Sequence, residues 1–317
     1  MMSAYTEQQV EFNSEVLLKG TLTIPDQPQA KFPAVLIIGG TGDNDRDGYN
    51  QTKKMDLTAY RELAHYLGEQ GYMALRYDKR GCGASEGDYY ETGFWDLVDD
   101  AIAAVRFLRE HDQVDSVILL GHSEGAMIAP AVVEKEALDG MILLSGVAEA
   151  SNVAFGRQTE ELFAYLAELK GFKGFLIRLF KIQEKAKKQN EATIQRILSS
   201  PTPVIKIKGQ KINAKWFQEQ FQFNVLDYLP KVTCPVLAIT GTKDMQVVPE
   251  HAQVLAERVS GPSEWHLIPN LTHVLRKTDA QLTPLTLIKE YKKQIQHPID
   301  SELKEKISAW MSRYFQR

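Results

Sequence analysis

Residues 117–129 of this chain read VILLGHSEGAMIA. Four apolar residues lead into the pattern Gly-x-Ser-x-Gly, and small or apolar residues follow it, which predicts a strand, a sharp turn and a buried helix. A serine in such a turn has a strained backbone that lifts its hydroxyl above the sheet, and Gly121 and Gly125 leave the space this needs. The stretch therefore predicts a nucleophile elbow with Ser123 as nucleophile, although the pattern alone would also fit a glycine-rich turn with a surface serine.

Strand and helix patterns alternate on both sides of this turn. An alternating apolar and polar pattern predicts an N-terminal hairpin from residues 5–12 and 16–24. Further strands are predicted over residues 34–38, 72–77, 117–120, 141–144, 235–240 and 263–268. Helices are predicted over residues 57–70, 94–110, 249–259 and 300–314. This order predicts an α/β fold with a mostly parallel central sheet flanked by helices.

The alternation stops near Gly146 and resumes at Pro235. Between these points, residues 160–170 and 175–188 have helical patterns, and residues 204–208 are compatible with a short strand. No strong central strand is evident in this region, which predicts an insertion between two strands of the sheet.

We expect residues 1–150 and 229–317 to form the core and residues 151–228 to form a helical cap, inserted before the strand at 235–240. The segment 151–228 contains 13 lysines and arginines against 7 aspartates and glutamates. We interpret this excess of basic residues as a helix face exposed to solvent rather than as a surface that binds a ligand.

The composition is ordinary for a soluble globular protein, with 44% hydrophobic and 25% charged residues in 317. A net charge of -4 gives no reason to expect a nucleic acid partner. No leader pattern or membrane-spanning apolar run is visible, so we expect a cytoplasmic protein without stable membrane association. Cys82 and Cys234 are expected to stay reduced. The sequence leaves open whether the chain forms a homodimer.

No cofactor or metal is expected. The glycine-rich run at residues 39–42 is not followed by a dinucleotide or phosphate-binding motif, and the acidic residues Asp43 and Asp45 would repel a pyrophosphate. No group of histidines, cysteines or carboxylates has the spacing of metal ligands.

A serine nucleophile needs a base within hydrogen-bond reach and an acid that orients the base. His273 is the histidine that follows a strand in a loop, and Asp244 directly follows the strand at 235–240, at the sheet edge where Ser123 is expected. The other histidines fall in or beside helices, in a strand, in the elbow or far down the chain: His65, His111, His122, His251, His266 and His297. The order Ser123, Asp244, His273 is that of α/β-hydrolases.

An oxyanion hole needs two backbone N–H groups directed at the carbonyl oxygen of the substrate. One is expected from Glu124, which follows the nucleophile at a helix N-terminus. The other is expected from Thr41, in the loop after the strand at 34–38.

The chain resembles the α/β-hydrolase superfamily over almost its whole length. Within it, residues 40–47, 77–85 and 121–125 are similar to bacterial carboxylesterases often labelled serine-aminopeptidase-like. The resemblance implies a nucleophile, acid and base at Ser123, Asp244 and His273, and oxyanion donors at Thr41 and Glu124. It also implies that the loops Asp45-Arg46 and 78–80 shape the pocket. The His-Gly oxyanion motif of lipases is replaced by Gly39-Gly40.

These features favour hydrolysis of carboxylic esters through an acyl-serine intermediate. Thioester hydrolysis and aminopeptidase action remain alternatives that would use the same triad. A non-catalytic receptor of this fold is another alternative, although receptors of this kind typically lose a triad residue. Dehalogenase chemistry is disfavoured, because it uses an aspartate at the position where this chain has Ser123.

The predicted cap carries more apolar side chains than short helices can bury among themselves, so some of them should face the serine. Trp216 and Phe217 are the expected substrate-lining residues, with an optimum at short to medium acyl chains. The full apolar set is Leu162, Phe163, Leu166, Phe175, Leu179, Phe180, Trp216, Phe217 and Phe221.

Overall fold

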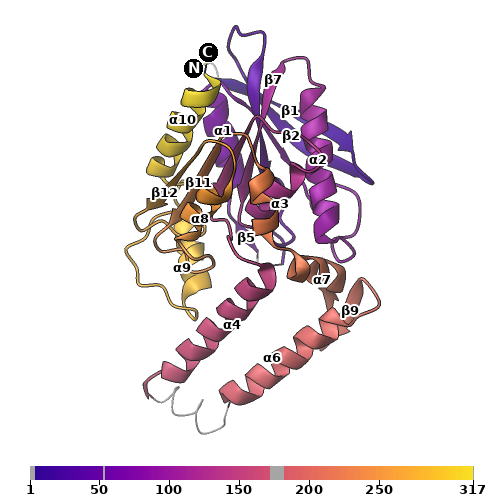
Figure 1. The fold of residues 1–317 in the computed structure, drawn as a ribbon, viewed down its shortest axis with the longest axis vertical. Coiled ribbons are helices and arrows are strands. Elements are labelled where there is room, and N and C mark those ends of the chain that lie inside the picture. Colours follow the sequence, from indigo (N-terminus) through magenta and orange to yellow (C-terminus); the bar gives the residue numbers. More distant parts are fainter. Residues whose placement is uncertain (1–3, 53, 172–181, 317) are drawn as a thin grey trace.

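The computed structural model describes residues 4–52, 54–171 and 182–316 (Figure 1). In this part of the chain, the central sheet has eight strands in the order β1-β2-β6-β3-β7-β8-β11-β12. β2 pairs antiparallel with β1 and β6, and the remaining neighbours are parallel. The strands are β1 (Tyr5–Asn13), β2 (Leu17–Pro25), β3 (Phe32–Ile38), β6 (Met73–Tyr77), β7 (Val114–His122), β8 (Gly140–Leu144), β11 (Val236–Gly241) and β12 (Ser263–Ile268). The predicted fold class, an α/β fold with a mostly parallel sheet, is confirmed.

Helices cover both faces of the sheet. Adjacent side chains of a strand point to opposite faces, so Leu36 of β3 joins one hydrophobic cluster and Ile37 joins the other. One cluster includes residues of α2 (Phe94–Arg109), α3 (Glu124–Val132) and α8 (His251–Arg258). The other includes residues of α1 (Ala59–Glu69), α9 (Leu287–Gln294) and α10 (Ser301–Phe315). Every residue of β3 is buried, as expected for a central strand.

The segment 151–228 leaves the core after β8 and returns before β11. Its long helices α4 (Ser151–Glu168) and α6 (Ile182–Leu198) extend away from the sheet, as Figure 1 shows. A hairpin of β9 (Val204–Ile207) and β10 (Gln210–Asn213) then leads to α7 (Ala214–Gln222). The short 3-10 helices η1 (Val225–Asp227) and η2 (Leu229–Lys231) complete the return.

Besides its helices, this segment contains the hairpin of β9 and β10, and β9 matches the short strand that residues 204–208 allowed. Lys208 and Gly209 both have positive φ angles, 50° and 83°, which is the geometry of a two-residue hairpin turn. A Lys-Gly turn between polar strands gives a weak sequence signal, so β10 was missed. Helix α6 also continues past residue 188, and the start of the helix predicted at 175–188 lies outside the described residues.

Polar contacts dock α7 onto the core. Asn213 Nδ2 donates to the carbonyl of Thr92 at 2.6 Å, and Lys215 pairs with Asp96 at 2.7 Å. Glu219 accepts a hydrogen bond from the amide of Trp95 at 3.0 Å. Helix α7 is therefore held against the core, whereas α4 and α6 project from it.

A pair of strands and a helix of the core were also absent from the prediction. A small pair of strands, β4 (Tyr49–Asn50) and β5 (Met55–Asp56), folds the loop after β3 back on itself. Helix α9 lies in a largely polar stretch, with only Tyr291 and Gln294 buried. Among the described helices, none has the length and apolar character needed to cross a membrane.

Candidate active site

The turn between β7 and α3 has the geometry of a nucleophile elbow. Ser123 lies at φ 56° and ψ -112°, a conformation that is strained for a residue with a side chain. A β-carbon on Gly121 would lie 2.1 Å from the carbonyl oxygen of Gly125, and one on Gly125 would lie 2.2 Å from that of Ile38. Both positions therefore require glycine, for the reason that the sequence suggested.

Side chains from three separate loops meet at Ser123. His273 Nε2 lies 3.0 Å from Ser123 Oγ, and His273 Nδ1 lies 2.8 Å from Asp244 Oδ2. These residues follow β7, β11 and β12, whose carboxyl ends share one edge of the sheet. The structure thus brings together the three residues predicted as nucleophile, base and acid.

Asp244 is fully buried and held on both carboxylate oxygens. Its Oδ1 accepts hydrogen bonds from the amides of Gln246 and Val247 at 2.8 and 3.0 Å, which leaves Oδ2 for His273. Burial alone would raise the pKa of Asp244, but the neighbouring His273 and the two amides hold that pKa below its ordinary value. The carboxylate is therefore ionised at neutral pH and can orient the imidazole.

A second buried histidine joins three parts of the site. The Gly40 amide donates to Tyr60 Oη at 2.7 Å, and this hydroxyl lies 3.0 Å from His122 Nδ1. The carbonyl of His273, 2.9 Å from His122 Nε2, can only accept, so a neutral ring carries its proton on Nε2 and its Nδ1 accepts from Tyr60. Burial lowers the pKa of His122 to about 3, so its ring is neutral. Tyr60 falls in the helix predicted over residues 57–70 and His122 in the elbow, and neither was predicted to take part in the site.

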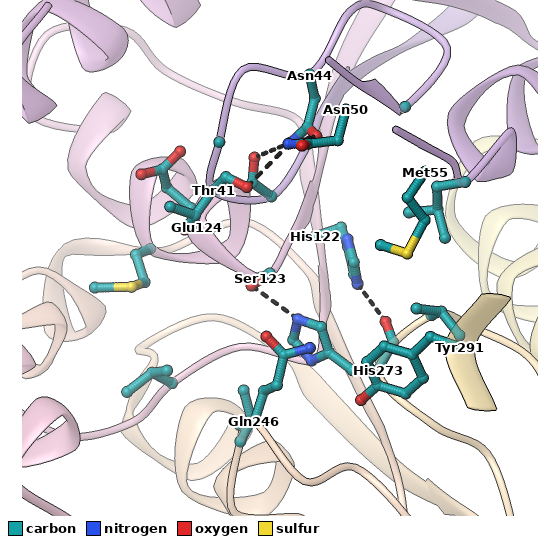
Figure 2. Close-up of a pocket in the computed structure, with 18 of the residues that line it drawn as sticks. Thr41, Asn44, Asn50, Met55, His122, Ser123, Glu124, Gln246, His273 and Tyr291 are labelled. Carbon is teal, nitrogen blue, oxygen red and sulfur yellow. Dashed lines mark hydrogen bonds between the residues drawn. The ribbon is translucent and has the colours of Figure 1, made fainter. Parts of the chain in front are cut away.

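The predicted oxyanion donors lie beside the serine. Thr41 and Glu124 both line the cavity that contains Ser123, and Figure 2 shows the Glu124 carboxylate turned away from His273. That carboxylate accepts from Lys79 Nζ at 2.6 Å and from Trp216 Nε1 at 2.7 Å. The oxyanion role of the Thr41 and Glu124 amides stays a prediction.

The cavity around Ser123 has a volume of about 590 Å³, in the range of small-molecule sites. Within the described residues, Glu124 is the one carboxylate that lines it, and no lysine or arginine does. Its walls otherwise combine apolar side chains with neutral polar ones. Representative lining residues are Asn44, Asn50, Met55, Val147, Phe155, Gln246, Leu287 and Tyr291.

Trp216 lines this cavity, as predicted, but Phe217 is not among its described lining residues. Phe217 stacks instead on Phe155 and Phe221, at ring-centre distances of 5.2 and 5.8 Å. Successive helical residues point about 100° apart, and on α7 this turns Phe217 toward these two rings while Trp216 lines the cavity.

The rest of the predicted apolar set is dispersed. Phe163 is buried, whereas Leu162 is exposed on α4. Phe175, Leu179 and Phe180 lie outside the described residues.

The loops that the resemblance implied to shape the pocket act from behind it. Arg46 forms an ion pair with Asp78 at 2.6 Å, and Arg80 forms one with Asp100 at 2.5 Å. None of these four residues lines the cavity around Ser123. Burial would raise the pKa of Asp78, but Arg46 and backbone amides hold it below its ordinary value. The pairs therefore fix the loops that carry the lining residues.

The chain is similar to known proteins over most of its length. The chain matches the family described as serine aminopeptidase, S33, over residues 54–277. It is similar to the esterase EstD of Thermotoga maritima, with 26% identity over 310 residues that cover 97% of this chain and 68% of that protein.

Solved structures share the fold. Est1E from Butyrivibrio proteoclasticus, with ferulic acid bound, has a TM-score of 0.59 and 20% identity, covering 91% of this chain and 100% of that chain. The Pyrococcus furiosus esterase Pf2001 has a TM-score of 0.55 and 18% identity, covering 98% of this chain and 93% of that chain.

Proposed function

Since this chain belongs to the serine aminopeptidase, S33, family and is a hydrolase of the α/β-hydrolase fold, we propose that it cleaves small, uncharged carboxylic esters through an acyl-serine intermediate. The observation that carries the proposal is the hydrogen-bonded line from Asp244 through His273 to Ser123, at 2.8 and 3.0 Å, in the wall of a cavity. Each of the three side chains has the neighbour that the chemistry requires.

In the proposed reaction, Ser123 Oγ attacks the ester carbonyl carbon while His273 Nε2 takes the hydroxyl proton. Asp244 stabilises the imidazolium that forms. The tetrahedral oxyanion is bound by the amides of Thr41 and Glu124, and His273 then gives its proton to the departing alcohol. Water, activated by the same histidine, attacks the acyl-serine and releases the acid.

The lining of the cavity favours an ester over the alternatives. A free amino terminus needs an available carboxylate, and the carboxylate of Glu124 is already bound by Lys79 and Trp216. The phosphates of an acyl-CoA need cations near the opening, but the lysines of α6 at 185, 187 and 188 are exposed to solvent and do not line the cavity. An uncharged acyl group of short to medium length matches the mixed neutral walls. We also propose that the segment 151–228 acts as a cap, because Phe155 and Trp216 from it line the cavity.

The test is Ser123→Ala, assayed with p-nitrophenyl esters of two to ten acyl carbons. Turnover should fall by about 10⁴-fold or more, since acyl transfer loses its nucleophile. A fluorophosphonate should label wild type at Ser123 and leave the variant unlabelled. Ser116→Ala, at the other end of β7, is the matched control and should keep full activity. Equal ester turnover by wild type and Ser123→Ala would refute the mechanism.

The substrate class is tested with the same preparation. Aminoacyl p-nitroanilides and acyl-CoA thioesters should give kcat/KM values well below those of the aryl esters. Faster cleavage of the anilides would move the assignment to an aminopeptidase.

A further inference from the structure

Lys79 lies behind the loop that carries Thr41. Its ammonium group donates to the carbonyl oxygen of Gly40 at 2.6 Å and to Glu124 Oε2 at 2.6 Å. The side chains of Lys79 and Glu124 are 9% and 0% exposed, so this ion pair is shielded from water. Asn44 Nδ2 also donates to the Gly40 oxygen, at 2.9 Å.

The carbonyl that Lys79 binds belongs to the same peptide group as the amide of Thr41. A trans peptide is planar, and its C=O and N–H point in opposite directions. Two donors that fix the direction of the Gly40 oxygen therefore also fix the direction of the Thr41 N–H. A cation on the oxygen further polarises the peptide group, which makes the N–H a stronger donor.

The other end of the ion pair reaches the second proposed donor and the inserted segment. Glu124 is the residue after the nucleophile, and its Oε1 accepts a hydrogen bond from Trp216 Nε1 of α7 at 2.7 Å. One chain of contacts thus runs from α7 through Glu124 and Lys79 to the Gly40–Thr41 peptide. Both proposed oxyanion residues take part in it.

We propose that Lys79 and Trp216 are positioning residues of the oxyanion hole: Lys79 directs and polarises the Gly40–Thr41 peptide, and Trp216 holds the Glu124 carboxylate that keeps Lys79 in place. The inference rests on the proposed function and deepens it. It makes the docking of α7 a condition for full stabilisation of the tetrahedral intermediate.

If the ion pair of Lys79 and Glu124 only stabilised the fold, variants that lack it but still fold would keep the kcat and Ki of wild type. Buried ion pairs contribute little net stability, but removal of one partner leaves an unpaired buried charge and can prevent folding. We therefore use the double variant Lys79→Met with Glu124→Gln, which removes both charges, and Trp216→Phe, which removes the N–H donor and keeps an aromatic ring. Trp265→Phe, an exposed tryptophan on β12, is the matched control.

The readouts are kcat and KM for p-nitrophenyl butyrate, and Ki for an alkyl trifluoromethyl ketone, which forms a tetrahedral oxyanion on the serine. Thermal unfolding is measured in parallel. In the double variant kcat should fall by about 10- to 100-fold, somewhat less than for the loss of a whole oxyanion donor. KM should stay within about twofold, because the ester ground state does not use these contacts, and Ki should rise by the same factor as kcat falls. Trp216→Phe should shift kcat and Ki in the same directions by about 3- to 10-fold.

Folded variants whose kcat and Ki stay within about twofold of wild type would overturn the inference. A fall in kcat with an unchanged Ki would overturn it as well, and Trp216→Phe decides the question if the double variant does not fold. A wild type that neither cleaves esters nor reacts with a fluorophosphonate would instead overturn the proposed function, so the two failures are distinguishable.

Discussion

Tyr60→Phe tests the hydrogen-bonded chain that joins the Gly40 loop to the base. The substitution removes one oxygen and leaves the ring, which is 3% exposed, in place. Burial raises the pKa of Tyr60, so its hydroxyl stays protonated and serves as both acceptor and donor. Without it, the Gly40 amide loses its acceptor and His122 Nδ1 loses its donor.

The size of the effect follows from these two groups. A buried polar group left without a partner costs about 1 to 3 kcal/mol, so two such groups should lower the free energy of unfolding by about 2 to 6 kcal/mol. That is a large part of the 5 to 15 kcal/mol that is roughly typical of a folded domain. Ester turnover should fall too. Without Tyr60 Oη the Gly40 amide is no longer held in place, and Gly40 begins the peptide group whose N–H belongs to Thr41.

Urea unfolding at pH 7.5 and kcat for p-nitrophenyl butyrate measure the two effects. Tyr66→Phe is the control, since Tyr66 lies on the same helix, is half-buried and should change stability by less than about 0.5 kcal/mol. A loss of stability under about 1 kcal/mol in Tyr60→Phe, with unchanged kcat, would show that the Gly40 amide and His122 find other partners.

The acid, the buried histidine and the elbow glycine each provide a further test. Asp244→Asn should lower kcat for aryl esters by about 10³- to 10⁴-fold because it favours the wrong imidazole tautomer, whereas Asp279→Asn, at an exposed position, should not; the reverse result would reassign the acid. His122 has a folded pKa of about 3 against an ordinary 6.5, so on acidification the unfolded state binds the proton first and stability falls from pH 6.5 downwards by about 1.4 kcal/mol per pH unit. Urea unfolding at pH 7 and 5 should show this loss reduced in His122→Gln and unchanged in His297→Gln, whose histidine is exposed. Gly125→Ala places a β-carbon 2.2 Å from a backbone carbonyl oxygen and should destabilise by about 3 kcal/mol or more; a thermal unfolding temperature equal to wild type would contradict the elbow geometry.

The positions of Ser123, Asp244 and His273 could be predicted because they depend on topology. Each residue follows a strand, and the carboxyl ends of parallel strands meet at one edge of a sheet. Apolar runs identify such strands in a single sequence, and the glycines of the elbow mark the turn. No knowledge of side-chain contacts is needed to place the three loops together.

The contacts that hold these loops could not be predicted in this way. Tyr60 meets His122 across 62 positions of the chain, and Trp216 meets Glu124 across 92. Neither pair lies in a motif with fixed spacing. From the sequence, a tyrosine in an amphipathic helix, such as Tyr60, is therefore predicted only to be a core residue. The different placement of Phe217 has a simpler cause: a run of aromatic residues in a sequence does not show which ring faces a cavity and which stacks on other rings, as Phe217 does on Phe155 and Phe221.

The charge distribution of the chain bears on solubility more than on substrate choice. The segment 151–228 is basic as a sequence, but the described lysines of α6 point to solvent, where salt screens them over about 10 Å. Inside the cavity the one carboxylate, on Glu124, is bound by Lys79 and by Trp216, so an entering substrate meets no free charge from the described residues. The ionic groups near the site are instead used in pairs to hold loops in place, as in Arg46 with Asp78. We therefore expect the shape of the cavity and its neutral polar groups to select the substrate, because no unpaired charged side chain of the described residues lines the cavity.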